Sequence, residues 1–298
     1  MRILVTGATG TLGSALVPAL LKEGHEVRAL SRTKRESRAN VDWRWGDLIS
    51  GNGLEDALRD VDAIAHLATS GPKGLGAVDI PGTRTLMLFA REAGVPHVLF
   101  TSVVGADRAA FNYLRYKLEA ERLIIESGLG WTILRATPFH QWLDRRLRDL
   151  SSFPVLPVDR SLPWQPVHTG EVAKRAAALL GAGPESGEIE FGGPEVLNTE
   201  DLVRTWLRAR DRRRPRLPVR YPGRLYAAQR AGALKTDALP TGVITWHDYL
   251  NPPPLDLSGD DFAIEHTASP TSPANQPEQD PDLHVYGGDE GYERPTRS

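Results

Sequence analysis

Three glycines in the first turn of the chain constrain its fold more than any other feature. The segment Thr6-Gly7-Ala8-Thr9-Gly10-Thr11-Leu12-Gly13 joins a β-rich run at residues 2–6 to an amphipathic stretch at 11–23. Glycine at a strand-to-helix junction permits a tight turn and lets the backbone approach a ligand closely. The N–H groups that begin the helix then face an anion. The segment therefore predicts a dinucleotide site, with cofactor contacts at Gly7, Thr9, Gly10, Thr11, Leu12 and Gly13.

Alternating short β-rich and helical patterns fill the first 135 residues, and this alternation is typical of parallel βαβ units. Strands are expected at 2–6, 26–30, 41–45, 62–67, 97–101 and 131–135, and helices at 11–23, 52–60, 80–93 and 111–127. The predicted fold class is α/β, a Rossmann-like doubly wound parallel sheet that binds ligands at the carboxyl ends of its strands.

The regular alternation ends after residue 136. Prolines punctuate residues 150–168, and helices near 170–181, 199–210 and 223–234 surround a short strand near 187–191. We expect a Rossmann domain at 1–135, a smaller substrate lobe at 136–250 in the same globule, and a tail at 251–298.

The tail differs sharply in composition from the rest of the chain. It holds ten acidic residues and two Lys/Arg, a charge of −8 against −2 for the whole chain, so residues 1–250 carry +6. Eight prolines and almost no apolar periodicity predict a disordered, acidic extension. The alternative is a tail that folds back on the basic body or binds a protein partner.

Composition excludes several other classes of protein. The absence of cysteine rules out disulfides, a thiolate nucleophile and Cys-ligated metals. No run of about 18 apolar residues suggests a membrane span, and a strand directly after Met1 leaves no room for a secretory signal, so we expect a cytoplasmic protein. Arginines are frequent at 204–220, but no stacking aromatic residues interleave with Arg212–Arg216, which favours a solvated helix end and loop over a nucleic-acid surface. The histidines show no metal-binding spacing.

The Gly-x-x-Gly-x-x-Gly spacing resembles the loop of the short-chain dehydrogenase/reductase family, specifically its extended and atypical members. The likeness continues at Asp47-Leu48, His66-Leu67-Ala68-Thr69, Arg135-Ala136-Thr137-Pro138-Phe139-His140, and Gln165-Pro166-Val167-His168 followed by Glu171-Val172-Ala173. The last two segments are similar to the NmrA-like, NAD(P)H-binding branch, and the resemblance covers about residues 1–250. It implies that Asp47 and Leu48 contact the adenine and that Leu67 and Ala68 close over the cofactor.

The end of the second strand favours NADP over NAD. A carboxylate there accepts a hydrogen bond from the ribose 2′-hydroxyl, whereas a 2′-phosphate is held by arginine. Ser31 and Arg32 occupy this position, and no acid occurs before Glu36. NADP is therefore the predicted cofactor, with NAD as the alternative if Arg32 and its basic neighbours are only a solvated loop.

Tyr113 and Lys117 are spaced to lie on one face of a helix. A free tyrosine, with a pKa of about 10, is a weak acid at neutral pH, and a nearby cation favours its ionised form. We expect Tyr113 to protonate a substrate oxygen, Lys117 to assist it and bind the ribose, and Ser102 to hydrogen-bond the same oxygen. Tyr116 is the competing phenol, although it points away from Lys117. A surface role for Tyr113 is the alternative, since atypical members of the family lose this tyrosine.

These residues predict an NADP-dependent oxidoreductase that moves a hydride between nicotinamide and a carbonyl or alcohol of a small organic substrate. His140 and Trp164 are weaker candidates for substrate contact. A non-catalytic NAD(P)-sensing regulator and a sugar-nucleotide epimerase-like enzyme are the alternatives.

Overall fold

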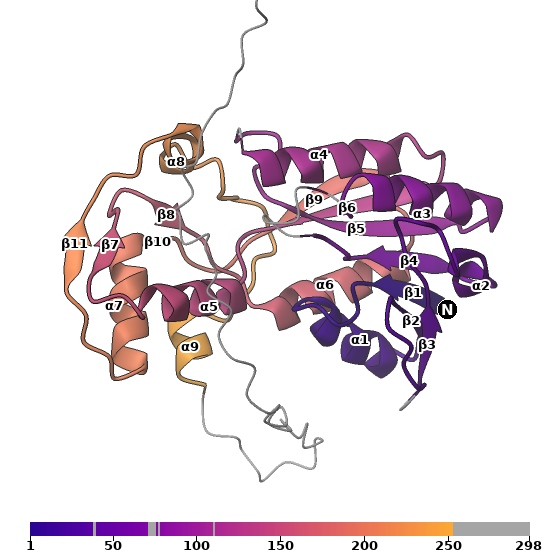
Figure 1. Cartoon of the computed structure of the whole chain (residues 1–298), viewed down its shortest axis with the longest axis horizontal. Helices are drawn as coiled ribbons and strands as arrows, with labels where there is room; N and C mark the ends of the chain where they lie inside the picture. The colour runs from indigo at the N-terminus through magenta and orange to yellow at the C-terminus, as the bar shows by residue number, and fades with distance from the viewer. Residues whose placement is uncertain (38–39, 71–75, 77, 110, 253–298) are drawn as a thin grey trace, which may run out of the picture. The chain divides into compact units, whose positions relative to one another are not determined.

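The computed structural model describes residues 1–37, 40–70, 76, 78–109 and 111–252. In this part of the chain, seven parallel strands form one sheet in the order β3-β2-β1-β4-β5-β6-β9 (Figure 1). The strands are β1 (Arg2–Thr6), β2 (Glu26–Ser31), β3 (Val41–Trp45), β4 (Ala63–His66), β5 (His97–Val103), β6 (Gly130–Ala136) and β9 (Gly187–Phe191). The order reverses between β1 and β4, so the carboxyl ends of these two strands flank the crevice where such sheets bind ligands.

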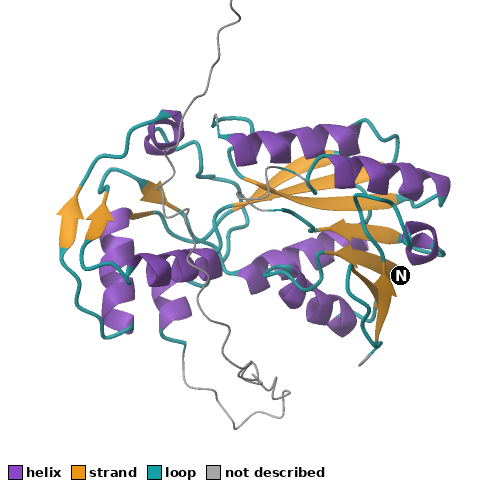
Figure 2. Cartoon of the chain, viewed as in Figure 1, coloured by secondary structure: helices purple, strands orange, loops and turns teal. Residues whose placement is uncertain are grey.

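Helices cover both faces of this sheet (Figure 2). One face carries α1 (Gly13–Lys22) and α6 (Thr169–Ala182), and the other carries α2 (Leu54–Leu58), α3 (Pro81–Glu92) and α4 (Asn112–Ile125). Alternate strand residues supply the two cores: Ile3 and Val5 pack toward α1 and α6, whereas Leu4 packs on the opposite face. The predicted Rossmann-like fold class is confirmed.

The smaller lobe contains fewer elements than the predicted range 136–250. The strand at 187–191 is not part of the lobe, because β9 pairs with β6 from Thr132↔Gly187 to Ala136↔Phe191. Helix α6 likewise packs against α1 under the sheet. The sequence places both elements in the lobe because the segment inserted between β6 and α6 interrupts the alternation that marks a Rossmann domain.

The remaining elements form the lobe around the buried Trp206 and Trp246. They are α5 (His140–Leu150), β7 (Leu156–Val158), β8 (Pro163–Trp164), β10 (Leu197–Asn198), α7 (Thr199–Ala209), β11 (Arg216–Pro218), α8 (Arg224–Arg230) and α9 (Trp246–Leu250). Helix α5 was not expected, although its buried Leu143 and Leu147 have helical spacing. Helix α8 ends four residues earlier than predicted.

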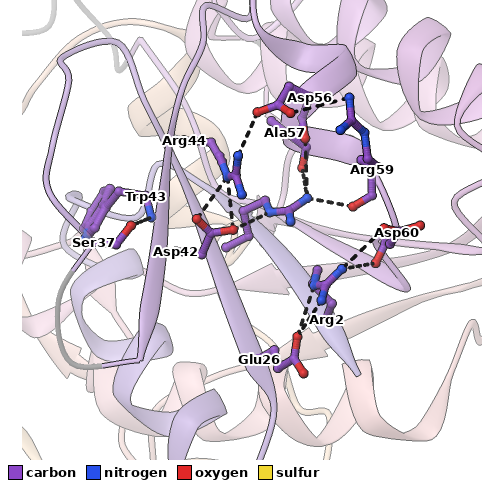
Figure 3. A network of polar contacts seen from close by, with 11 residues as sticks. Arg2, Glu26, Ser37, Asp42, Trp43, Arg44, Asp56, Ala57, Arg59 and Asp60 are labelled. Atoms are coloured by element: carbon purple, nitrogen blue, oxygen red, sulfur yellow. Dashed lines mark hydrogen bonds and ion pairs between the residues drawn. The ribbon is translucent and has the colours of Figure 1, made fainter.

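A polar network fixes the amino ends of β1, β2 and β3 to α2, at the edge opposite the glycine turn (Figure 3). Arg28 is 5% exposed; its Nε donates to Asp42 at 2.9 Å and its Nη1 to the Arg59 carbonyl at 2.7 Å. Arg44 joins Asp42 to Asp56. Every charge in this network has an opposite charge or a carbonyl nearby, so its role is structural.

The contacts divide the chain into a unit at Met1–Asn251 and a second unit that starts at Pro252. Residues 253–298, for which the sequence predicts disorder, lie outside the described residues. Among the helices of the described part, none is long and apolar enough to cross a bilayer.

Candidate functional site

The turn between β1 and α1 requires glycine at two of the predicted positions. Gly7 has φ +68°, and a Cβ there would lie 2.8 Å from the Ala68 nitrogen. A Cβ on Gly13 would lie 2.2 Å from the Gly7 carbonyl oxygen. The Gly10 N–H donates to that same oxygen at 2.9 Å. The turn is therefore folded as tightly as a phosphate cradle needs, and the segment at Leu67 and Ala68 lies directly against it.

Thr6 and His66 connect this turn to the next strand. The Thr6 hydroxyl oxygen lies 2.7 Å from His66 Nδ1 and accepts hydrogen bonds from the N–H groups of Leu67 and Ala68, both at 3.2 Å. Two segments expected to touch the cofactor are thus held together at the carboxyl ends of β1 and β4.

The tautomer of His66 follows from its second partner. His66 Nε2 lies 2.9 Å from the Thr83 hydroxyl, which donates its proton to the Asp79 carbonyl at 2.6 Å. Nε2 must therefore donate, and Nδ1 must accept from Thr6. Complete burial, together with the Lys117 cation, lowers the pKa of His66 to about 3, so the ring is neutral.

Asp79, which the sequence did not single out, holds Lys117. Asp79 Oδ1 lies 3.4 Å from Lys117 Nζ, and the two side chains are 0% and 4% exposed. The carboxylate also accepts hydrogen bonds from the hydroxyls of Thr69 and Ser70, both at 2.7 Å. Burial would raise the pKa of the Asp79 carboxyl, but the Lys117 cation and these hydrogen bonds outweigh burial and lower it. An acid directly before a proline-initiated helix, Asp79-Ile80-Pro81, was the available sequence signal.

The structure brings Lys117 to the end of β5, where it contacts the two residues that precede Ser102. Lys117 Nζ lies 3.4 Å from the Thr101 carbonyl oxygen and 4.7 Å from the Phe100 ring centroid. The Ser102 hydroxyl is buried without a hydrogen-bond partner among the described residues. A buried hydroxyl without a hydrogen-bond partner is unusual in a folded protein, and the neighbouring Thr101 hydroxyl shares this property among the described residues.

Tyr113 is half-buried, one helical turn before Lys117 on α4. In the described part of the chain, no hydrogen bond joins the two side chains, so Lys117 is anchored by Asp79 and not by the phenol. Tyr116 packs elsewhere: a Cβ on Gly76 would lie 2.7 Å from its ring.

The predicted contacts to the outer half of the cofactor lie at the ends of β2 and β3. The Ser31 hydroxyl donates to the Thr33 carbonyl at 2.8 Å, and Arg32 is exposed beyond it. Asp47 accepts from the Ile49 N–H at 2.7 Å, while Leu48 is buried.

The two candidates for substrate contact differ in exposure. His140 is 0% exposed, between Tyr249 at 5.1 Å and Trp246 at 5.5 Å, and burial with the neighbouring His168 lowers its pKa to about 3. Trp164 is half-buried, and its indole N–H donates to Thr199 at 2.9 Å. His140 is thus a core residue of the lobe, while Trp164 keeps part of its ring accessible.

Comparison of this chain with known proteins identifies the family that it resembles. Residues 7–154 match the family model described as NAD(P)H-binding. Over 181 residues the chain is 32% identical to the photosystem II assembly factor Ycf39 of Cyanophora paradoxa. This match covers 58% of this chain and 54% of the relative. The match therefore spans about half the length of that relative.

Two solved structures share the fold over 84% of this chain. One is a nucleoside-diphosphate-sugar epimerase from Staphylococcus aureus, 20% identical, with a TM-score of 0.71 and 99% of that chain covered. The other is an NADPH-dependent quinone oxidoreductase from Escherichia coli, solved with NADPH, 19% identical, with a TM-score of 0.72 and 98% of that chain covered. At these identities the likeness concerns the fold. The glycine turn from Gly7 onward and the strands β2–β6 fall within the matched segment, and through residues 7–154 this chain belongs to the NAD(P)H-binding family.

Proposed function

We propose that the protein is an NADP-dependent oxidoreductase that interconverts a carbonyl and an alcohol on a small organic substrate. The observation that carries the proposal is the buried Lys117, one helical turn from Tyr113 on α4, whose ammonium contacts the Thr101 carbonyl at the end of β5. The next residue, Ser102, has a buried hydroxyl with no hydrogen-bond partner among the described residues. The glycine turn supports a dinucleotide site, because a Cβ at Gly7 or Gly13 would collide with neighbouring backbone and force open the tight strand-to-helix turn that such sites use.

The chain's own residues supply the proton and the orientation. The dinucleotide, when bound, gives or takes the hydride. In the reducing direction the Tyr113 hydroxyl donates its proton to the substrate oxygen, and Ser102 donates a hydrogen bond to that oxygen. The Lys117 cation stabilises the phenolate that remains, which regains a proton from solvent.

NADP is the proposed form of the cofactor. Arg32 is exposed at the end of β2, the described residues place no ion-pair partner beside it, and no carboxylate lies between Ser31 and Glu36. A guanidinium with free donors binds a 2′-phosphate, whereas an NAD site needs an acceptor for the 2′-hydroxyl.

One observation favours a second function, a cofactor-binding regulator without turnover. The Asp79 carboxylate partly neutralises Lys117, which weakens the support that the cation gives to a Tyr113 phenolate. Ycf39 is named as an assembly factor rather than as an enzyme. Epimerisation of a sugar nucleotide is the remaining alternative and rests on the shared fold.

Turnover with a matched pair of tyrosine variants tests the proposal. NADPH oxidation is followed at 340 nm (the absorbance band of the reduced cofactor) with a panel of aldehydes, ketones and quinones. We expect Tyr113→Phe to lower kcat by about 10²-fold or more, the usual contribution of a general acid, with unchanged NADPH affinity. Tyr116→Phe on the same helix should keep its rate. Equal rates in both variants would contradict the role of Tyr113, and tight NADPH binding without turnover across the panel would favour the regulator.

A further inference from the structure

A cavity of about 550 Å³ opens beside the carboxyl end of α7, in a part of the lobe that the proposed reaction does not use. Six arginines and one acid, Asp211, line it together with two apolar residues; the arginines are Arg204, Arg208, Arg212, Arg213, Arg214 and Arg216. We propose that this arginine pocket binds a compact anion that carries two or more phosphate groups.

The chain turns sharply at the end of α7, and this turn gathers the arginines. The Arg212 N–H donates to the Leu207 carbonyl at 2.9 Å, and Asp211 has φ +45°. The following strand β11 pairs with β7, which brings Arg216 back along the same side. Figure 1 shows α7, β7 and β11 on the side of the lobe away from the seven-stranded sheet, so the pocket is separate from the glycine turn.

Two of the guanidinium groups are held in place without being neutralised. Arg212 Nη1 donates to the Ser151 hydroxyl at 2.8 Å, and Arg214 Nε donates to the Ser151 carbonyl at 3.0 Å. Ser151 is 0% exposed at the end of α5, so it is a rigid anchor. Neutral acceptors fix the position of a guanidinium but leave its charge and its other N–H donors for a ligand.

The pocket carries more positive charge than the protein balances. Arg204 pairs with Asp201, and Arg216 pairs with Glu200. Arg208 and Arg213 are exposed and form no ion pair with any described residue. Four guanidinium groups thus face the single carboxylate of Asp211, a net charge of +3. The carboxyl end of a helix stabilises a nearby cation by at most about 1 kcal/mol at the protein surface. This effect is too small to explain why four guanidinium groups without an ion-pair partner among the described residues gather there.

Phosphate chemistry fits this pocket better than a nucleic acid does. The planar fork of arginine binds phosphate oxygens in pairs, and the cavity has the volume of a small-ligand site. Single-stranded nucleic acids are held by stacking on aromatic rings. Among the residues that the structure describes, no aromatic side chain lines the pocket, and Trp206, the ring that Arg212 covers, is only 1% exposed.

Calorimetry with inorganic tripolyphosphate, on the full chain at physiological ionic strength and with saturating NADPH, tests the assignment. Arg208→Gln/Arg213→Gln should raise the Kd for tripolyphosphate by about tenfold or more, the loss expected from charge-assisted hydrogen bonds. The matched control is Arg84→Gln/Arg91→Gln, two exposed arginines on α3 with the same change of charge. It should leave the Kd within about twofold, because distant surface charges are screened. Asp211→Asn removes the opposing carboxylate and should lower the Kd.

Three results would overturn the proposal. An unchanged Kd in Arg208→Gln/Arg213→Gln, or an equal loss in the control, would show that the arginine pocket is not the site. Displacement of tripolyphosphate by NADPH would assign binding to the glycine turn. A single-stranded oligonucleotide that binds more tightly at equal phosphate concentration would assign the pocket to nucleic acid.

Discussion

Asp79 Oδ1 and Lys117 Nζ lie 3.4 Å apart, and both side chains are buried. The pair joins the start of α3 to the middle of α4, and Thr83 and His66 extend the same chain of contacts to Thr6 beside the glycine turn. The cofactor turn and the candidate catalytic lysine are therefore linked through one hydrogen-bonded network.

A double-mutant cycle measures that link. Breaking a buried ion pair leaves one charge unpaired and typically costs about 3–5 kcal/mol. Asp79→Asn and Lys117→Met should each lower the free energy of unfolding in urea by about this amount, and the double variant by clearly less than their sum. Glu119→Gln, which breaks an exposed pair with Arg122 on the same helix, should cost under about 1 kcal/mol. Strict additivity would show that the two side chains do not interact.

Two alanine substitutions test whether cofactor binding depends on glycine in the turn between β1 and α1, with a glycine outside the turn as the control. Gly13→Ala puts a methyl group 2.2 Å from the Gly7 oxygen, so the turn must shift and NADPH affinity should fall by about tenfold or more. Gly181→Ala on α6 meets no atom within 4 Å. It should stabilise the fold by about 0.5–1 kcal/mol and leave the affinity unchanged. Calorimetric titration and thermal unfolding report both effects, and normal NADPH binding by Gly13→Ala would refute the cradle.

Cofactor selectivity is expected to depend on Arg32. The unmodified protein should bind NADPH more tightly than NADH, and Arg32→Ala should erase the difference by raising the Kd for NADPH about tenfold or more. Arg35→Ala is the matched control, because that guanidinium lies 5.1 Å above the Trp43 ring. Equal affinities for the two dinucleotides before mutation would overturn the assignment to NADP.

Stability should fall with acid in a way that depends on His66. The pKa of this ring is about 3 in the folded chain against 6.5 for an unperturbed histidine. Unfolding therefore takes up a proton below pH 6.5, and stability falls by about 1.4 kcal/mol per pH unit for each such ring as pH drops toward 3. Between pH 6 and about 5, the unfolding free energy of His66→Gln should therefore fall less steeply as the pH drops than that of the unmodified protein, by about 1.4 kcal/mol per pH unit. Urea unfolding at several pH values measures this slope.

His140, whose pKa is also about 3, contributes equally to both proteins and cancels in the comparison. His247→Gln, with 71% of the His247 side chain exposed, serves as the control and should leave the slope unchanged. Identical slopes in all three proteins would mean that His66 titrates normally in the folded chain.

Local patterns in the sequence predicted the sheet and the glycine turn, because strand periodicity and glycine spacing are readable within a few neighbouring residues. Asp79 escaped prediction because its importance depends on Lys117, a residue far along the chain that only the packing of α3 against α4 brings near. His140 is a weak candidate for substrate contact in the sequence because it follows the sixth strand closely. The rings of Trp246 and Tyr249, supplied by a distant helix, bury it instead.

The position of β9 at the edge of the sheet affects how the protein can be shortened. The family match stops at residue 154, yet the last strand of the sheet comes from 187–191. A fragment that ends at residue 154 would leave the backbone N–H and C=O groups of β6 that face β9 unpaired and would remove the α6 covering from α1. Exposed strand edges of this kind template intermolecular pairing, so such a fragment should precipitate or form oligomers even though it contains the whole cofactor turn.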